Sequence, residues 1–349
     1  MRFFNKLLAG PKARRVSIHA KNENFEVGKN ETILESALKN GINYPHDCTV
    51  GTCGSCRTRL LSGNVEAITP FGYTLSKEEL EAGYILACQA LPKSDLEIDV
   101  DIASGGAIEP VTQGATLVSL EALTHDIKKV VWRVEKPMFW RAGQYMNVRW
   151  NNSSDHRSYS FATAPSRRGA TELTTFIRHV PGGALTDQIF EKDPYALTYE
   201  IDGPHGNFWL RSGDGPILCI AGGSGLAPIL GVLQHAAENK VRRDCILLFG
   251  ARGQRDLYCS PDIAAVRNAW TAGFDFWQVL SEEQNEKYRY GLVTDYIEKA
   301  LEKLGPGAQA YLCGPPPMID AAIKVLTEQC KITLDNIFYD KFTDASSKK

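Results

Sequence analysis

The sequence predicts a multidomain protein of the α+β and α/β classes: a small α+β domain, an antiparallel β-barrel, and an α/β domain with a doubly wound parallel sheet. Length is the first observation, because 349 residues exceed what one hydrophobic core ordinarily organises. The second is a change of pattern, since short β-patterned runs are followed by buried strands that alternate with helices. The third is that four of the nine cysteines fall within residues 48–88, which gives the first domain a chemical signature of its own.

The composition is that of a globular protein in water, with 43% hydrophobic residues, 23% charged residues and a formal net charge of −2. This near-neutral balance excludes a nucleic-acid binder, which needs a dominant basic surface. No apolar run approaches the ~20 residues that span a bilayer, and the N-terminus is too short and too broken by basic residues for a secretory signal. We therefore expect a cytoplasmic, monomeric protein.

Residues 1–15 form a basic leader that carries five basic side chains and no acidic one. Its apolar residues stand at helical spacing: Phe3, Phe4, Leu7 and Leu8. One interpretation is a peripheral contact with a membrane, or with a membrane-bound partner, through this leader. The other is a disordered basic tail, and the sequence does not decide between them.

Residues 16–102 read as the small α+β domain. An apolar alternation predicts a hairpin, and residues 32–40 have the spacing of an amphipathic helix that Gly41 ends. The domain holds 13 acidic and 7 basic residues, so it is acidic next to a basic leader. Residues 103–113 (ASGGAIEPVTQ) are small and glycine-bearing, as in a linker.

Short β-patterned runs fill residues 114–211, which predicts the antiparallel barrel; they fall at 117–120, 129–134, 145–150 and 173–177. Residues 212–342 alternate buried strands with helices, which predicts the parallel sheet. The expected strands there are 217–221, 245–249 and 311–313, and the expected helices are 226–238 and 318–329. Residues 343–349 are left as a tail.

The cysteine cluster has the spacing Cys48-x4-Cys53-x2-Cys56, with Cys88 after 31 further residues. This is the ligand spacing of plant-type [2Fe–2S] ferredoxins. Glycines in the loop allow the backbone to approach the sulfurs and to aim N–H groups at them. A structural zinc site is the rival, but it commonly uses paired CxxC motifs and only one is present. A Rieske centre would need histidines in place of two cysteines.

Two segments of the barrel region carry polar groups suited to a phosphorylated, aromatic cofactor. The first is Arg157-Ser158-Tyr159-Ser160, in which the arginine suits a phosphate and the tyrosine an aromatic or ribityl face. The second is Gly182-Gly183 leading into a helix that includes Thr186, which suits an anion. By themselves both segments also fit a solvated charge and an ordinary turn.

The α/β region holds a glycine-rich turn at a strand-to-helix junction, formed by Gly222, Gly223, Ser224, Gly225 and, two residues on, Pro228. Such a turn admits a pyrophosphate. It departs from the dinucleotide fingerprint G-x-G-x-x-G, because Pro228 occupies the third glycine position. A purely structural strand–helix turn is the alternative at this point.

Together these motifs resemble the ferredoxin–NADP reductase superfamily, whose flavin domain carries R-x-Y-S/T and whose nicotinamide domain carries G-G-x-G-x-x-P. The resemblance implies that Arg157, Tyr159 and Ser160 hold the flavin and that Gly183 and Thr186 lie near its pyrophosphate. It implies FAD rather than FMN, because relatives with an N-terminal ferredoxin domain, itself a β-grasp fold, generally use FAD.

Further residues gain expected roles from the same resemblance. The loop after the strand at 311–313 would line the nicotinamide site through Cys313, Gly314, Pro315 and Met318. Cys313 would position the reacting carbon rather than act as a nucleophile, since hydride transfer needs no covalent intermediate. Phe342 is the candidate for the aromatic residue that shields the flavin ring.

Coenzyme choice depends on two residues that follow the strand at 245–249. Arg252 could accept a 2′-phosphate, whereas Asp256 could bind a free ribose and repel a phosphate. The GARxxxDLY pattern is similar to that of NADH-using oxygenase reductases, so we expect NADH, with NADPH as the alternative.

Over nearly its whole length the chain resembles the ferredoxin-fused reductases of bacterial multicomponent oxygenases, in particular those that serve xylene and p-cymene mono-oxygenases. The resemblance implies electron transfer from NADH through FAD to the [2Fe–2S] cluster, and on to the hydroxylase component of an oxygenase for hydrocarbon or aromatic substrates. A reductase for a deoxysugar-type dehydratase is one alternative. A redox-sensing protein is another, although the intact hydride-site motifs disfavour it.

Overall fold

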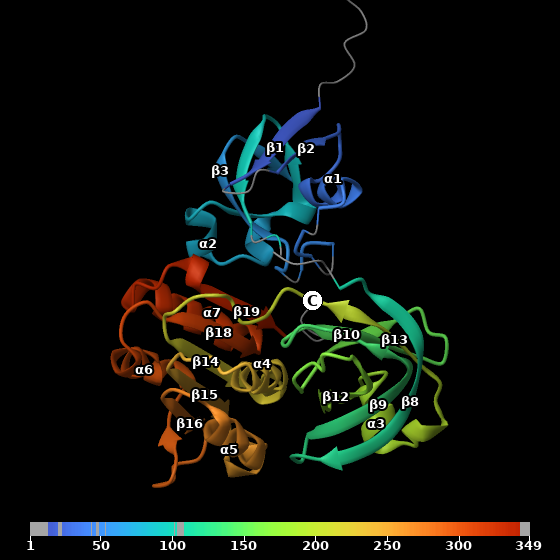
Figure 1. The fold of residues 1–349 in the computed structure, drawn as a ribbon, viewed down its shortest axis with the longest axis vertical. Helices are drawn as coiled ribbons and strands as arrows, with labels where there is room; N and C mark the ends of the chain where they lie inside the picture. Colours follow the sequence, from blue (N-terminus) through green and yellow to red (C-terminus); the bar gives the residue numbers. More distant parts are fainter. Residues whose placement is uncertain are drawn as a thin grey trace, which may run out of the picture. The chain divides into compact units, whose positions relative to one another are not determined.

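The computed structural model describes residues 13–19, 23–42, 44–46, 49–52, 54–100, 102 and 108–342. It divides into two compact units, Met1–Ala107 and Ile108–Lys349 (Figure 1). Most of the leader, the tail and part of the expected linker lie outside the described residues. The expected barrel and α/β domain share the second unit.

The first unit is built on a five-stranded mixed sheet in the order β2-β1-β7-β3-β5. The predicted hairpin is β1 with β2, and β7 runs parallel to β1, so that the first and last strands of the sheet lie side by side. This pairing, with a helix packed on the sheet, is the β-grasp fold. The strands are β1 (Arg14–Ile18), β2 (Asn24–Val27), β3 (Arg57–Ser62), β5 (Tyr84–Leu86) and β7 (Leu96–Asp99), and a small second sheet pairs β4 (Val65–Ala67) with β6 (Ala90–Pro92).

Helix α1 (Ile33–Lys39) forms where the sequence predicts it, because both of its ends are satisfied locally. Thr32 accepts a hydrogen bond from the backbone N–H of Glu35 at 3.1 Å, and the Glu35 carboxylate accepts one from the N–H of Thr32 at 2.9 Å. Its apolar side buries Ile33, Leu34 and Ala37. The shorter helix α2 (Lys77–Glu81) begins with the same kind of capping box.

The N-terminal half of the second unit is a six-stranded antiparallel sheet in the order β11-β10-β13-β8-β9-β12. A bridge between Phe161 and Thr175 joins its two edges, so the sheet curls into a barrel. Strand β8 begins at Val111, three residues before the expected start of the barrel. The elements are β8 (Val111–Ala122), β9 (Ile127–Met138), β10 (Tyr145–Trp150), β11 (His156–Ser160), β12 (Ala170–Arg178), α3 (Thr186–Glu191) and β13 (Tyr199–His205).

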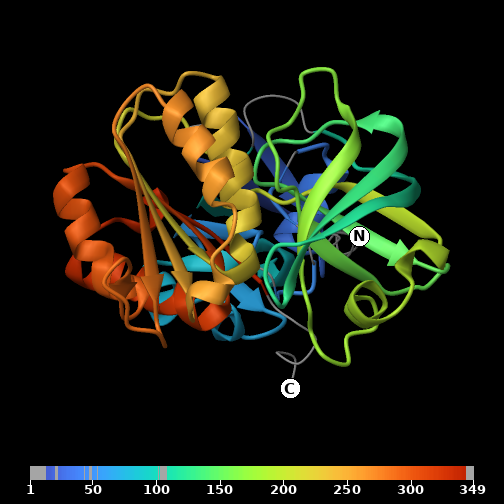
Figure 2. The same cartoon turned by 90° about the horizontal axis from the view of Figure 1, so that it is seen from below.

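The C-terminal half is a parallel sheet in the order β17-β16-β15-β14-β18-β19, with helices on both faces (Figure 2). The chain fills one side from β14 outward and then returns to the other side at β18, so the order reverses between β14 and β18. Ligands bind open α/β sheets at such a reversal. The strands are β14 (Ile217–Gly222), β15 (Cys245–Ala251), β16 (Phe274–Leu280), β17 (Arg289–Tyr290), β18 (Gln309–Gly314) and β19 (Ile337–Lys341), and the helices are α4 (Leu226–Glu238), α5 (Ser260–Ala269), α6 (Ile297–Leu304) and α7 (Pro316–Lys324).

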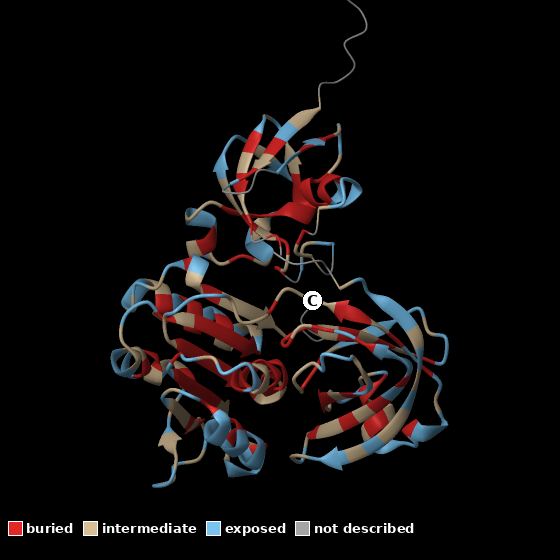
Figure 3. Cartoon of the chain, viewed as in Figure 1, coloured by how far each residue is buried: buried red, intermediate tan, exposed pale blue. Residues whose placement is uncertain are grey.

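Barrel and parallel sheet share one hydrophobic core, which explains why they form a single unit. Ile127 and Phe176 of the barrel lie in the same cluster as Cys219 of β14 and Leu230 of α4. A side chain at Gly231 of α4 would come within 3.1 Å of barrel backbone carbonyls, so this glycine lets the helix approach the barrel. The central strands are buried on both faces, as their apolar sequences predict (Figure 3).

None of the helices that the structure describes is both long and apolar enough to cross a bilayer.

Helix α4 ends in a Schellman motif whose left-handed position is occupied by Lys240, at φ 57°. The motif's two hydrogen bonds run from the N–H of Lys240 to the carbonyl of Ala237 and from that of Val241 to the carbonyl of Ala236. A side chain is strained at this backbone angle, whereas glycine is not. We expect Lys240→Gly to raise the free energy of unfolding by about 0.5–1 kcal/mol, measured by the midpoint of urea unfolding.

The matched control is Glu238→Gly, two residues earlier and equally exposed but inside the helix. There glycine loses helix propensity without relieving strain, so stability should fall by up to about 1 kcal/mol. A decrease in both variants would contradict the strain at Lys240.

Candidate functional site

Two of the four expected cluster ligands, Cys56 and Cys88, meet in the first unit. Cys56 precedes β3 and Cys88 lies in a 3₁₀ turn (Ala87–Gln89), and their Sγ atoms are 3.2 Å apart. They form no disulfide, since a disulfide bond is ~2.05 Å long, and both are almost fully buried. Two buried thiols at this separation fit two ligands of one iron. Cys48 and Cys53 lie outside the described residues.

The backbone around these sulfurs has the features expected of a cluster loop. Gly51 and Gly54 have φ of 83° and 81°, which side-chain-bearing residues rarely adopt. The N–H of Cys88 points to Cys56 Sγ at 3.5 Å, and the Gln89 amide lies 3.8 Å from Cys88 Sγ. Such donors stabilise a cluster that gains an electron. The residues present therefore fit a [2Fe–2S] cluster.

The expected flavin residues follow one another on β11, which pairs with β10. Ser158 lies opposite Asn147 and donates a hydrogen bond to its Oδ1 at 2.7 Å. Ser160 is buried, while Tyr159 is partly buried, and burial raises its pKa. Strand alternation places Arg157 and Tyr159 on one side of β11 and the two serines on the other.

Arg157 has the character of a phosphate ligand. Its guanidinium donates to the carbonyl of His156 at 2.7 Å and lies over the Trp150 ring at 5.7 Å. Within the ranges described above, no carboxylate pairs with it, which leaves a positive charge that a phosphate could use. The residues of β11 fit a flavin, and their contacts with it stay predictions.

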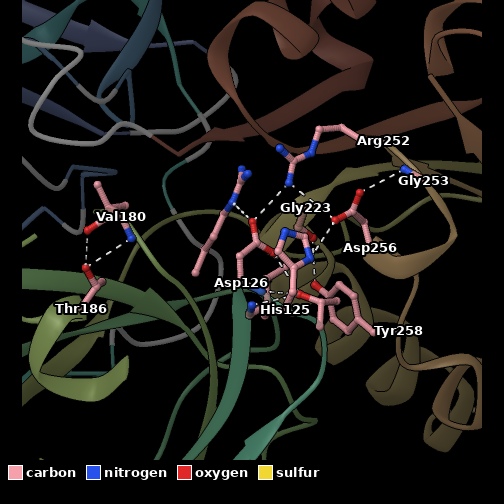
Figure 4. Close-up of polar contacts among 12 residues, drawn as sticks. His125, Asp126, Val180, Thr186, Gly223, Arg252, Gly253, Asp256 and Tyr258 are labelled. Carbon is pink, nitrogen blue, oxygen red and sulfur yellow. Dashed lines mark hydrogen bonds and ion pairs between the residues drawn. The ribbon is translucent and has the colours of Figure 1, made fainter. Parts of the chain in front are cut away.

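The Gly182-Gly183 segment forms a closed loop before α3. Thr186 Oγ1 donates to the carbonyl of Val180 at 2.9 Å and accepts from its N–H at 3.3 Å (Figure 4). A side chain at Gly183 would come within 2.3 Å of that hydroxyl, so the loop requires glycine there. Gly182 has φ 77° and open space around it. Thr186 thus holds the loop, and its contact with a pyrophosphate stays a prediction.

The nicotinamide motifs meet at the point where the strand order reverses. Ala221 of β14 is in register with Cys313 of β18, so the turn after β14 and the loop after β18 leave the sheet side by side. A side chain at Gly225 would come within 2.3 Å of the Cys313 carbonyl, although the backbone angles of Gly225 are ordinary helical ones. At Gly222 it would come within 2.6 Å of Met318 Sδ. Glycine is needed here for close approach of the two loops.

Cys313 and Phe342, whose predicted roles stay predictions, lie at either side of this loop. Cys313 is fully buried, and burial, with the nearby Asp340 carboxylate, raises the pKa of its thiol well above the ordinary value. A neutral thiol is a poor nucleophile, which agrees with a positioning role. The N–H of Phe342 donates to the carbonyl of Gly314 at 2.9 Å, which fixes this aromatic residue beside the loop.

A cavity of about 260 Å³ opens at the same edge of the sheet. Six of the expected coenzyme residues line it: Gly222, Gly223, Arg252, Asp256, Pro315 and Met318. Five others do not line it: Cys313, Gly314, Ser224, Gly225 and Pro228. Cys313 and Pro228 are buried, Ser224 and Gly225 lie in the turn before α4, and Gly314 packs against Gly222 and Met318.

Sequence reasoning missed the contribution of the barrel to this cavity, which comes from Asp126, Ile127 and Arg178. Arg178 ends β12, two residues before the loop held by Thr186. Asp126 lies in the turn between β8 and β9, where a Thr-x-Asp pattern signals only a turn. Sequence reasoning also missed Ser281, which follows β16, the strand next to β15 in the parallel sheet.

Charges of both signs line the cavity. Asp126 Oδ2 accepts from Arg178 Nε at 3.0 Å and from Arg252 Nη2 at 3.4 Å. Asp256 Oδ1 lies 3.5 Å from Arg252 Nη2 and 3.4 Å from His125 Nδ1 (Figure 4). Burial alone would raise the pKa of Asp126, but the hydrogen bond from Thr124 and the charge of Arg178 lower it below its usual value. The cavity therefore presents two cations and two anions to a ligand.

Comparison with known proteins agrees with this arrangement. Residues 16–93 match the 2Fe-2S iron-sulfur cluster binding domain, residues 114–209 the oxidoreductase FAD-binding domain, and residues 219–324 the oxidoreductase NAD-binding domain. The electron transfer component of xylene/toluene monooxygenase from Pseudomonas putida is 39% identical and covers 97% of both chains. The reductase subunit of an aromatic O-demethylase from Amycolatopsis is 34% identical, over 95% of this chain and 99% of that protein.

Solved structures show the same fold over the same length. The Amycolatopsis cytochrome P450 reductase GcoB superposes with a TM-score of 0.70 at 32% identity, over 95% of this chain and 99% of that chain. The ferredoxin reductase in carbazole 1,9a-dioxygenase superposes with a TM-score of 0.65 at 28% identity, with equal coverage.

Fold, site and domain matches define an oxidoreductase in which an iron–sulfur domain is fused to an FAD domain and an NAD domain. More narrowly, this chain belongs to the family of ferredoxin-fused reductase components of multicomponent oxygenases.

The contact between Gly225 and the Cys313 carbonyl gives a direct test of the coenzyme site. We expect Gly225→Ala to separate the two loops and to lower kcat/KM for NADH by about 10²-fold, because displacements of about 1 Å have effects of that size. Steady-state reduction of ferricyanide by NADH measures it.

The control is Gly114→Ala in β8, where the added methyl would meet only a glutamate side chain at 3.5 Å. This variant should keep wild-type kinetics. Unchanged kinetics in Gly225→Ala would show that the loops do not depend on this approach.

Proposed function

We propose that the chain oxidises NADH at the cavity between β14 and β18 and delivers single electrons, through FAD and then the [2Fe–2S] cluster, to the hydroxylase component of an oxygenase for hydrocarbon or aromatic substrates. The observation that carries the proposal is the meeting of the two nicotinamide motifs around one cavity, where Gly222 and Gly223 face Pro315 and Met318. FAD, when bound, supplies the conversion between a two-electron donor and one-electron acceptors.

In this proposal the residues of the chain have the following roles. Arg157, Tyr159 and Ser160 hold the flavin on β11, with the Thr186 loop near its pyrophosphate. The Gly222–Gly225 turn receives the coenzyme pyrophosphate at the N-terminus of α4. Cys313 sets the depth of the nicotinamide, and Phe342 covers the flavin ring until the nicotinamide arrives.

NADH is favoured over NADPH by the state of Arg252. Its guanidinium lies within 3.5 Å of carboxylate oxygens of both Asp126 and Asp256. Asp256 neutralises the cation that a 2′-phosphate would need, and it repels the phosphate itself. The printed names of the relatives refer to oxygenases and a demethylase, which favours an oxygenase over a dehydratase as the acceptor. Monomeric state and membrane contact through the leader stay predictions.

Removal of a cluster ligand should cut the electron path at its last step. We expect Cys88→Ala to abolish the visible absorption and rhombic EPR signal of the cluster and to stop NADH-dependent reduction of cytochrome c. Reduction of ferricyanide directly at the flavin should continue at the wild-type rate.

Cys330→Ala is the matched control, since Cys330 is a partly exposed cysteine of the other unit. Its spectrum and both activities should not change. A full cluster signal in Cys88→Ala would refute the ligand assignment.

The positioning role of Cys313 predicts a change in kcat rather than in coenzyme affinity. Cys313→Ala leaves a small void where the loop supports the nicotinamide, so kcat should fall by about 10- to 100-fold while KM for NADH changes little. Stopped-flow reduction of the flavin by NADH measures the step directly.

Cys245→Ala serves as its control, because Cys245 is equally buried but lies at the opposite end of β15, from which β18 is separated by β14. If both variants lose the same activity, the effect is one of core packing and the positioning role is wrong.

A further inference from the structure

Asp126 holds an unusual place among the cavity residues, because it comes from the barrel and yet contacts the α/β domain. Its turn is rigid: Thr124 Oγ1 donates to Asp126 Oδ1 at 2.9 Å and accepts from the N–H groups of Asp126 and Ile127. The Asp126 carbonyl accepts from the N–H of His179 at 2.8 Å. One carboxylate oxygen is thus used within the turn, and the other, Oδ2, is aimed at the cavity.

That second oxygen lies between two guanidinium groups from two domains. Arg178, at the end of β12 of the barrel, donates to it at 3.0 Å, and Arg252, just after β15 of the α/β domain, donates at 3.4 Å. Arg178 and Arg252 have side chains that are 41% and 45% exposed, whereas that of Asp126 is only 19% exposed. Two half-exposed cations therefore converge on one largely buried anion.

Arg178 also lies beside the glycine-rich turn that precedes α4, which suits an anion. Arg178 Nη1 is 3.8 Å from the position that a side chain would take at Gly223, and Tyr258 ties the Gly223 carbonyl with a hydrogen bond of 2.8 Å. A pyrophosphate bound at the turn would lie beside Arg178, which holds the Asp126 carboxylate, and Arg252 lines the same cavity. The arginines attract it, and the carboxylate repels it and competes for the same donors.

We propose that Asp126 is a resident counter-ion that occupies Arg178 and Arg252 in the free protein and releases them to the pyrophosphate of the coenzyme, so that this carboxylate weakens and sets coenzyme affinity. The contact is a latch between the barrel and the α/β domain that each coenzyme molecule opens. Arg252 keeps Asp256 as a partner when the latch opens, since Asp256 Oδ1 lies 3.5 Å from it. The inference rests on the proposed function, because it assumes that the cavity takes a dinucleotide.

The test uses the full-length holoprotein and the variant Asp126→Asn, which has the same shape and keeps an oxygen for Thr124 but carries no charge. Calorimetric titration with ADP-ribose measures pyrophosphate binding without redox chemistry. In Asp126→Asn we expect the Kd for ADP-ribose to be 5- to 10-fold lower than in the wild type. The KM for NADH should fall in parallel, and kcat should change less than twofold. The salt dependence of Kd should become steeper, because the arginines then meet the ligand without an internal competitor.

Glu172→Gln is the matched control. Glu172 pairs with Arg133 at 2.7 Å on the same barrel sheet, but both side chains are exposed and neither lines the cavity. Its Kd and KM should equal those of the wild type. Thermal unfolding of both variants shows whether a change in binding accompanies a loss of fold.

Each other outcome has a distinct meaning. A weaker Kd in Asp126→Asn would show that the carboxylate orients the arginines for the coenzyme, and an unchanged Kd would show that it only stabilises its turn; either overturns the latch. Failure of the wild-type protein to bind ADP-ribose or NADH at all would instead contradict the proposed function of the cavity.

Discussion

Close contact between the turn after β14 and the loop after β18 is the constraint on which the coenzyme site depends. The Cys313 carbonyl lies where a side chain at Gly225 would be, and Met318 fills the equivalent space at Gly222. Because both strands belong to one parallel sheet and pair in register, their ends must leave the sheet together. The cavity lies at this edge of the sheet, and the hydrogen bond from Phe342 to Gly314 continues the pairing of β18 with β19 there.

The two halves of the second unit are equally dependent on each other. Their shared core includes Phe176 of the barrel and Leu230 of α4. Because Gly231 has no side chain, backbone carbonyls of the barrel can pack directly against α4. As a result β11, where the flavin is expected, and the loops where the nicotinamide is expected belong to one compact body. A hydride donor and its acceptor need such a fixed separation, since transfer occurs only over a short distance. The iron–sulfur domain forms a compact unit of its own, and two of its expected ligands, Cys56 and Cys88, are buried in it beside the Cys88 N–H.

Most of the elements were predictable, because each has a local cause. Thr32 and Glu35 mark the start of α1, the alternation of β10 matches its strand, and the glycines after β14 mark the end of a buried strand. The structure differs from the prediction in where some elements begin and end. Strand β8 begins at Val111 because its first residues pair with β13, a partner some 90 residues away that no local pattern announces. The last expected helix is α7 followed by a π-helical turn at Val325–Gln329.

The chemistry of this protein was determined by the sequence alone, and the charge balance of its coenzyme cavity was decided only by the tertiary structure. The four cysteines at ferredoxin spacing lie within residues 48–88, and the Arg157–Ser160 motif and the glycine-rich turn are each a few residues long, so the sequence alone supports a resemblance to a known family. Asp126 and Arg252 are 126 residues apart and come from different domains, yet they share a hydrogen bond in the cavity. Their meeting depends on how the barrel packs against α4, and packing of that kind arises from the whole buried core rather than from any motif.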